Sequence, residues 1–220
     1  MPSNTVLFEN ACNSVLSNSS SVTIKASFSD FVETIHDKVY EDYKAAEQFV
    51  GDRLLSAQHN RTPNFAELDA FFMSIAQSRK SRAGKVFEWI LEELLNKRLG
   101  YPMDGQVNID GAKPDFVLPS KDYFDNNPID CMLLTAKRTL RERWRQVVTE
   151  ANKTYSYFLA TIDPKVTKTQ LEQAAKHKIF LVTTKNKIHQ SEHYAQAGNV
   201  LSFEDFIKNH LDPAMNRWPK

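Results

Sequence analysis

Two residues in this sequence have the types and positions expected of a hydrolytic site. Asp115 follows Pro114 and precedes the apolar run "FVL", and Lys137 ends the apolar run "CMLLTA". Because neighbouring strands can end at one edge of a sheet, we expect the carboxylate and the ammonium group to meet there. Such a pair suits metal-dependent phosphodiester hydrolysis, in which a carboxylate holds Mg²⁺ on the phosphate and a lysine orients the attacking water.

A single carboxylate binds Mg²⁺ weakly, so a second acid is expected. Its usual position is two residues before the lysine, where this sequence has Thr135. Glu150 can supply the missing group, because a helix that begins near Thr139 places Arg143 and Glu150 on one face. The alternative is that Glu150 is an ordinary surface acid.

Glu88, within "SRAGKVFE", is a further candidate acid. It lies on a helical stripe with apolar neighbours, which indicates partial burial. The alternative is that Glu88 forms an ion pair with Arg82 or Lys85. Each acid taken singly has an ordinary structural explanation, so the evidence lies in the occurrence of two acids and a lysine together.

Two basic segments stand out on a chain whose net charge is only +1. Residues 79–85, "RKSRAGK", hold four basic groups and no acid, and residues 137–145, "KRTLRERWR", hold five basic groups and one acid. Because phosphate neutralisation is local, two such patches suit a DNA-binding face, with Arg82 and Arg145 as contact candidates. The alternative is that both segments are solvated helix ends.

The second patch contains a combination of side chains that can read bases. Arg141 and Arg143 can each bind guanine O6 and N7 in the major groove, and Glu142 can accept from cytosine N4. The three together complement adjacent C·G pairs. The alternative is that Glu142 only completes a capping box with Thr139 at the start of a helix.

Composition and motifs exclude several other classes of protein. The 220 residues, 41% hydrophobic and 11% aromatic, suit one domain with a core, or a domain with a helical extension. Cys12 and Cys131 are too far apart in sequence for a zinc motif, and we expect a soluble protein of the reducing cytoplasm. No apolar run is long enough to span a membrane, and the start of the chain does not resemble a signal peptide. His189 and His193 lack the HExxH zinc signature, and the six glycines form no phosphate-binding loop.

The order of predicted elements indicates an α/β protein with an N-terminal helical block. Residues 1–27 look irregular apart from a short strand at 22–26. Helical periodicity or end signals predict helices at 30–57, from Pro63, at 81–99, 139–153, 167–177 and 203–210. The helix from Pro63 is expected to bury Phe65, Leu68, Phe71, Phe72 and Ile75. Ser202 and Asp205 are expected to cap the last helix. Strands are predicted at 106–109, 115–118, 131–137, 155–161 and 178–184, with a last short one at "NVLS".

The segments "SRAGKVFE", "KPDFVLPS" and "TAKRTLRERWRQVVTE" closely resemble the type II restriction endonucleases of the EcoRII catalytic-domain, PspGI and NgoMIV group. This group belongs to the PD-(D/E)xK nuclease superfamily. The resemblance covers roughly residues 75–160 and implies a central mixed β-sheet flanked by helices. In that group the second acid moves from the strand to the following helix, and twelve residues separate Lys137 from Glu150 as in the group.

The resemblance implies a role for each matching residue. Asp115 and Glu150 would be metal ligands, Lys137 the catalytic lysine and Glu88 an additional acid. The group keeps an arginine–acid–arginine reading head for a CC/GG core where this chain has Arg141, Glu142 and Arg143, and Gln77 is a softer match to a glutamine directed at the centre of the site. Some members flip central bases onto an aromatic side chain. Here Tyr40, Tyr43 and Phe49 lie in a suitable region, with core packing as the alternative.

The resemblance also implies Mg²⁺-dependent cleavage of both strands of double-stranded DNA at a short palindromic site, leaving 5′ overhangs. It implies a homodimer or tetramer and a cognate DNA methyltransferase. We expect residues 1–74 to form an N-terminal helical region, either part of the same domain or a small extension for dimerisation or DNA contact, and residues 75–220 to form the catalytic core. The alternatives are a nuclease of this fold acting in repair or on branched DNA, and a non-catalytic DNA-binding module.

Overall fold

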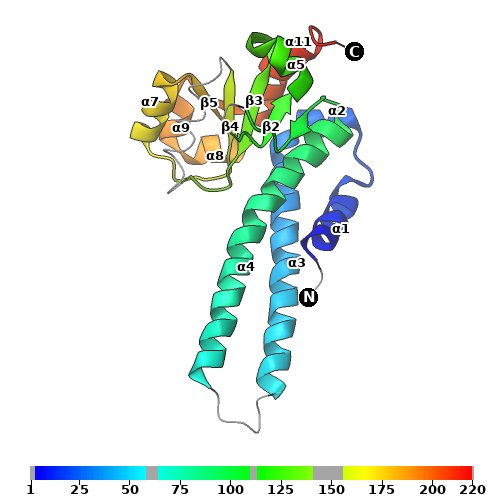
Figure 1. Ribbon diagram of the computed structural model, residues 1–220, viewed down its shortest axis with the longest axis vertical. Coiled ribbons are helices and arrows are strands. Elements are labelled where there is room, and N and C mark those ends of the chain that lie inside the picture. The colour runs from blue at the N-terminus through cyan, green and yellow to red at the C-terminus, as the bar shows by residue number, and fades with distance from the viewer. Residues whose placement is uncertain (1–2, 58–63, 110–112, 141–155, 220) are drawn as a thin grey trace.

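The computed structural model describes residues 3–57, 64–109, 113–140 and 156–219. Its most extended feature is a hairpin of two long helices, α3 (Phe28–Ala57) and α4 (Phe65–Leu91), which lie side by side and project far beyond the sheet (Figure 1). α1 (Asn4–Leu16) packs against α3 near the base of this hairpin. The chain therefore has a helical arm attached to an α/β body.

The N-terminal segment is helical, so the prediction of an irregular segment with a strand at 22–26 is wrong. The side chains of Ser3 and Ser20 cap α1 and α2 (Ser21–Ala26) by accepting hydrogen bonds from Val6 and Thr23. Serine at these positions satisfies free N–H groups at a helix start, and it does not mark a loop here. From α2 the buried side chain of Ile24 packs in the core.

α4 is one helix where two were predicted, from Pro63 and from 81–99. It continues without a break into a π-helical segment, η1 (Glu92–Arg98), and the chain leaves it at Gly100, whose φ of 75° favours glycine. The prediction of the helix end at Gly100 is therefore confirmed. The expected division between residues 74 and 75 falls inside α4.

Among the arm side chains whose burial the structure describes, the buried ones lie near the body. Val32, Ile35, Val39 and Tyr43 are buried along one side of α3 at helical spacing. The buried side predicted for the first half of α4 is wrong at two positions, since Phe65 is 86% exposed and Phe72 is 63% exposed. Both residues lie in the first third of α4, the part of this helix that projects beyond the sheet beside α3 (Figure 1).

The described residues form a sheet of six strands in sequential order. β1 (Asp104–Gly105), β2 (Phe116–Leu118) and β3 (Met132–Ala136) are antiparallel, whereas β4 (Tyr157–Ala160), β5 (Ile179–Thr183) and β6 (Val200–Ser202) continue from β3 in parallel. The sheet is mixed, as predicted. The first strand lies at 104–105 instead of 106–109, because Gln106 turns the chain with a φ of 55°.

Short helices surround the sheet. They are α5 (Lys121–Asn126), the 3₁₀ turn η2 (Pro128–Asp130), α7 (Lys168–Lys176), α8 (Lys185–Gln190), α9 (Glu192–Gln196), α10 (Phe203–Phe206), the π-helical η3 (Ile207–Leu211) and α11 (Asp212–Met215). α7, α10 and η3 confirm predicted helices, and the Ser202 hydroxyl accepts a hydrogen bond from the Asp205 amide at the last one. The helix predicted at 139–153 lies mostly outside the described residues.

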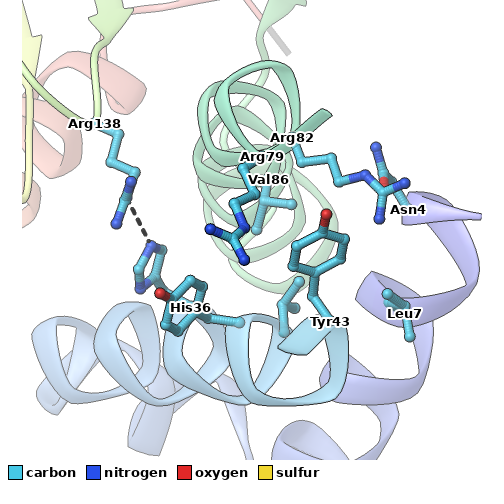
Figure 2. A pocket seen from close by; sticks show the side chains of 10 residues that line it. Asn4, Leu7, His36, Tyr43, Arg79, Arg82, Val86 and Arg138 are labelled. Atoms are coloured by element: carbon cyan, nitrogen blue, oxygen red, sulfur yellow. Dashed lines mark hydrogen bonds between the residues drawn. The ribbon is translucent and has the colours of Figure 1, made fainter. Parts of the chain in front are cut away.

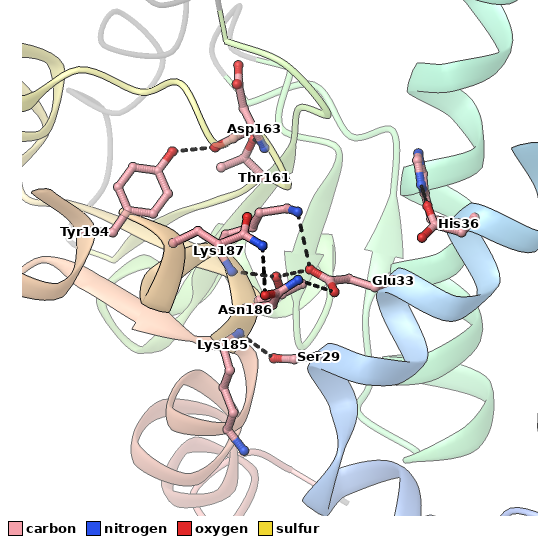
Figure 3. Close-up of polar contacts among 12 residues, drawn as sticks. Ser29, Glu33, His36, Thr161, Asp163, Lys185, Asn186, Lys187 and Tyr194 are labelled. Carbon is pink, nitrogen blue, oxygen red and sulfur yellow. Dashed lines mark hydrogen bonds and ion pairs between the residues drawn. The ribbon is translucent and has the colours of Figure 1, made fainter. Parts of the chain in front are cut away.

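The core consists of two apolar clusters, one on each face of the sheet. The first contains Leu134 of β3 together with residues of α1 to α4 and α10, and the second contains Leu133 of β3 together with Tyr194 of α9. Buried polar contacts also tie the helical arm to the C-terminal half. Glu204 accepts hydrogen bonds from the amide and hydroxyl of Ser29, and Glu33 accepts one from Thr184 at 2.5 Å (Figure 3).

Among the helices in the described ranges, none combines the length and the apolar character that crossing a bilayer requires.

Candidate active site

The structure brings Asp115 and Lys137 together, as the sequence predicts. Asp115 directly precedes β2 and Lys137 directly follows β3, and these strands are antiparallel neighbours with Phe116 opposite Leu134. The Nζ of Lys137 donates to Oδ2 of Asp115 at 2.8 Å. The pairing of two strands connected in sequence therefore places a carboxylate and an ammonium group at one edge of the sheet.

The backbone fixes both side chains. The amide of Ala136 donates to the same Oδ2 of Asp115 at 2.7 Å, and the amide of Lys137 donates to the carbonyl of Ala160 in β4 at 2.9 Å. The side chains of Asp115 and Lys137 are 16% and 12% exposed, so the ion pair is largely shielded from water and still open on one side. Its geometry is thus set before any substrate arrives.

The Asp115 carboxylate fits the role of a metal ligand. Within the described residues, both hydrogen bonds to this carboxylate go to Oδ2, which leaves Oδ1 available to a cation. Mg²⁺ is commonly bound by one or two carboxylates and by phosphate oxygens of the substrate. No cluster of three His, Cys, Asp or Glu side chains occurs in the described part of the chain, so Asp115 would act with a ligand from elsewhere.

Position 135 cannot supply that ligand. The Thr135 side chain is fully buried, and its hydroxyl accepts a hydrogen bond from the hydroxyl of Tyr157 at 2.8 Å. Glu150, the predicted second ligand, lies outside the described residues, as do Arg141, Glu142, Arg143 and Arg145.

The other predicted site residues lie on α4. Glu88 is half-buried near the end of this helix, which packs against β3, and its side chain has an interaction partner. Gln77 is exposed further toward the projecting end of α4. Arg82 is half-buried, and its guanidinium group lies over the ring of Tyr43 at 4.4 Å.

Arg82 also lines a cavity of about 220 Å³ between α1, α3, α4 and the end of β3 (Figure 2). Three arginines line it. Arg79 and Arg82 come from α4, and Arg138 directly follows Lys137. Nη1 of Arg82 is buried there without a hydrogen-bond partner in the described chain. Arg79 is paired with Glu47, so the positive charge of the cavity comes chiefly from Arg82 and Arg138. Together with the ring of Tyr43, these groups suit contact with an anionic polymer beside the end of β3.

His36 and Arg138 form the part of this cavity that the sequence did not reveal. The Nε of Arg138 donates to Nε2 of His36 at 3.1 Å (Figure 2). Burial lowers the pKa of His36, and Arg138 lowers it further, whereas the hydrogen bond with Asp37 opposes the shift. The ring is thus kept neutral and can accept a hydrogen bond. Arg138 could have been suspected from its position next to Lys137, but nothing local marked His36.

Comparison with known proteins identifies the family. The family described as EcoRII C terminal matches residues 43–207. The chain belongs to this family. It is 36% identical over 152 residues to the type II restriction enzyme SsoII of Shigella sonnei, which covers 64% of this chain and 48% of SsoII. It is 30% identical over 150 residues to the type II restriction enzyme EcoRII of Escherichia coli, covering 65% of this chain and 37% of EcoRII. The matched region therefore spans less than half the length of either relative.

Solved structures confirm the fold. Metal-depleted Ecl18kI in complex with uncleaved DNA superposes with a TM-score of 0.84 at 26% identity, over 100% of this chain and 81% of Ecl18kI. The restriction endonuclease PspGI in its substrate DNA complex gives a TM-score of 0.77 at 23% identity, over 99% of this chain and 95% of PspGI. The prediction of a PD-(D/E)xK restriction-endonuclease-like fold, and the predicted resemblance to the EcoRII and PspGI group, are both confirmed.

Proposed function

We propose that this chain is a type II restriction endonuclease that cleaves both strands of DNA at a short palindromic site with a CC/GG core. The observation that carries the proposal is the Asp115–Lys137 pair, held at 2.8 Å at the edge of β2 and β3 in a member of the EcoRII C-terminal family. Two relatives are named type II restriction enzymes, and Ecl18kI has been captured on DNA.

In this proposal Asp115 and Glu150 hold Mg²⁺, which when bound neutralises charge on the scissile phosphate and lowers the pKa of an attacking water. Oδ1 of Asp115 is the oxygen that fits this role, because Oδ2 is occupied by Ala136 and Lys137. Lys137 orients the water and stabilises the charge that develops on the phosphate oxygens. The attack expels the 3′ oxygen and leaves a 5′ phosphate, and Glu88 serves as an additional acid near the site.

The DNA is read by residues that directly follow the catalytic strand. We assign base contacts in the CC/GG core to Arg141, Glu142 and Arg143, for the donor and acceptor reasons given above. Arg82, Gln77 and Arg145 would contact the DNA more widely. The cavity lined by Arg79, Arg82 and Arg138 supports the wider DNA contacts, because its Arg138 directly follows Lys137 in the chain.

Cutting both strands of a palindrome requires two active sites, so we propose a homodimer, or a tetramer built from dimers. Residues 1–74 would contribute to dimerisation or DNA contact. A cognate methyltransferase would protect host DNA at the same site. The cytoplasm is the proposed compartment, which agrees with the free and buried thiols of Cys12 and Cys131, whose pKa values burial raises to about 12 and about 11.

Digestion of phage DNA with and without Mg²⁺ tests the proposal, followed by sequencing of the fragment ends. Discrete fragments with 5′ overhangs at a CC/GG core are expected. Nicking that depends on DNA structure instead of sequence would indicate a repair nuclease. Tight DNA binding without any cleavage would indicate a DNA-binding module, and either result would overturn the restriction assignment.

A further inference from the structure

A buried carboxylate contacts the segment that follows Lys137. Asp163 lies in the loop after β4 and is only 5% exposed. Its Oδ2 accepts a hydrogen bond from the amide of Leu140 at 2.9 Å, and its Oδ1 accepts one from the amide of Lys165 at 2.9 Å. Burying a carboxylate is costly unless its oxygens find donors, and both oxygens of Asp163 do. One of these donors belongs to a different segment, three residues after Lys137.

Thr161 makes a second contact with the same segment. This side chain is fully buried, and its hydroxyl donates to the carbonyl of Arg138 at 3.4 Å. The same hydroxyl accepts a hydrogen bond from the amide of Asp163 at 3.1 Å. Thr161 and Asp163 therefore act together, one on the carbonyl of Arg138 and the other on the amide of Leu140.

The loop that carries these groups is itself fixed from behind. The hydroxyl of Tyr194 donates to the carbonyl of Asp163 and accepts a hydrogen bond from the amide of Val166 at 3.2 Å (Figure 3). Burial raises the pKa of Tyr194 to about 12, so its hydroxyl keeps its proton and its donor role at physiological pH. The carboxylate of Asp163 is therefore presented from a rigid support.

These contacts hold nearly every residue of the segment 137–140. The amide of Lys137 is bound to Ala160, the side chain of Arg138 to His36, and the amide of Leu140 to Asp163. The side chain of Leu140 is also buried in the second core cluster. Residue 140 immediately precedes Arg141, the first of the proposed base-reading residues.

We propose that Asp163, assisted by Thr161, is a positioning residue that fixes the backbone of Arg138 and Leu140, directly before the proposed base-reading residues, relative to Lys137. Through this clamp, correct base contacts at Arg141, Glu142 and Arg143 align the scissile phosphate with Asp115 and Lys137. Asp163 touches neither DNA nor metal in this role. The inference rests on the proposed function, since it assigns the 141–143 segment to base reading.

The test compares Asp163→Ala and Thr161→Val with the wild-type protein. Affinities for a cognate and a non-cognate duplex are measured without divalent metal, and cleavage rates are measured under single-turnover conditions. Asp163→Ala is expected to reduce the cognate-to-non-cognate affinity ratio about tenfold and the cleavage rate by at least as much, while non-specific affinity changes about twofold or less. Thr161→Val should lower the affinity ratio and the cleavage rate, whereas Thr161→Ser, which keeps the hydroxyl, should retain the wild-type values of both.

Thr184→Val is the matched control for general destabilisation. Thr184 directly follows β5 and is also fully buried, and its hydroxyl donates to Glu33 of α3 and accepts a hydrogen bond from the amide of Lys187. It should lower the melting temperature about as much as Thr161→Val and leave the affinity ratio unchanged. If Thr161→Val and Thr184→Val change the ratio equally, or if Asp163→Ala weakens cognate and non-cognate binding to the same extent, the positioning role is wrong.

Hydrogen exchange separates this inference from the proposed function. The amide of Leu140 should be protected in the wild-type protein and exchange about tenfold faster in Asp163→Ala, with no DNA present. Unchanged exchange at Leu140 would overturn the clamp whatever the enzyme does. If Leu140 exchanges faster in Asp163→Ala but the wild-type protein neither cleaves DNA nor discriminates between the duplexes, the proposed function is overturned. The role of the clamp in base reading then falls with it.

Discussion

The carboxylate of Asp115 presents its two oxygens to different surroundings. Oδ2 receives the ammonium of Lys137 at 2.8 Å and the amide of Ala136 at 2.7 Å, whereas Oδ1 receives no hydrogen bond from the described chain. A single aspartate can therefore orient the lysine with one oxygen and bind a metal ion with the other. A change at Asp115 is therefore expected to affect metal binding, and a change at Lys137 is expected to affect the cleavage rate alone.

Asp115→Asn removes the charge and preserves the shape of the side chain. Mg²⁺ should bind much more weakly, and single-turnover cleavage should fall by about 10³-fold or more, while metal-free DNA binding persists. Asp104→Asn on neighbouring β1 is the control, because Asp104 is exposed and should tolerate the change. Wild-type cleavage by the Asp115 variant would exclude it as a metal ligand.

Lys137→Met keeps the apolar stem of the lysine and removes the ammonium group. Cleavage should fall by about 10²–10⁴-fold, because the water loses its orienting group. Calorimetric Mg²⁺ affinity in the presence of DNA should not decrease, since a cation beside Asp115 has been removed. A loss of Mg²⁺ affinity as large as that of Asp115→Asn would instead assign Lys137 a structural role.

Glu150→Gln tests the second metal ligand. The Mg²⁺ concentration that gives half-maximal cleavage should rise by about tenfold or more, because one of two charged ligands is lost. The comparison is with Glu88→Gln, which should lower the rate and leave the Mg²⁺ dependence less affected. The reverse pattern in a Mg²⁺ titration would make Glu88 the second ligand.

Arg82→Gln tests the basic cavity as a DNA contact. Affinity should fall similarly for cognate and non-cognate duplexes, and the slope of log affinity against log salt should become shallower by about 1. Fluorescence anisotropy over a range of salt concentrations measures both. A loss confined to the cognate duplex would mean that Arg82 reads sequence.

His36 predicts a pH dependence of stability. Its pKa in the folded protein is lowered, so as pH falls below about 6.5 the unfolded chain takes up the proton more readily than the folded protein. The free energy of unfolding should therefore decrease on acidification and recover at neutral pH. Asp37, Arg138 and Lys187 are the charged groups that influence the ring, and the hydrogen bond from Arg138 is lost when the ring is protonated.

Thermal melting between about pH 5 and about pH 8 measures the effect. His36→Gln is the control variant, because glutamine retains an acceptor near the position of Nε2 and does not titrate. Its melting temperature should depend less on pH than that of the wild-type protein. Identical pH profiles of the melting temperature would show that His36 does not contribute to the pH dependence of stability.

The sequence predicts those parts of the candidate site whose residues lie on strands that follow one another in the chain. Asp115 and Lys137 could be paired because Asp115 directly precedes one apolar strand and Lys137 directly follows the next one. His36, Thr161 and Asp163 could not be found in this way. His36 meets Arg138 across 102 positions, and Asp163 resembles any acid in a loop until the fold buries it beside Leu140.

The errors in the fold have a similar cause. The polar composition of residues 1–27 predicts irregular structure, although Ser3 and Ser20 each cap a helix there. Phe65 and Phe72 follow the spacing of a buried stripe, yet both are largely exposed on α4, where Phe72 contacts its neighbour Phe71. Periodicity predicts which side of a helix is apolar, but only tertiary structure decides whether that side is covered.

The contacts that fasten the helical arm to the body have a consequence for synthesis on the ribosome. Ser29 and Glu33 bind Glu204 and Thr184, which lie 175 and 151 positions later in the chain. α3 therefore emerges long before its polar partners have been translated, whereas Asp115 and Lys137 are only 22 positions apart and can meet as soon as their hairpin forms. These polar contacts of the arm can form only after residues 184 and 204 have left the ribosome.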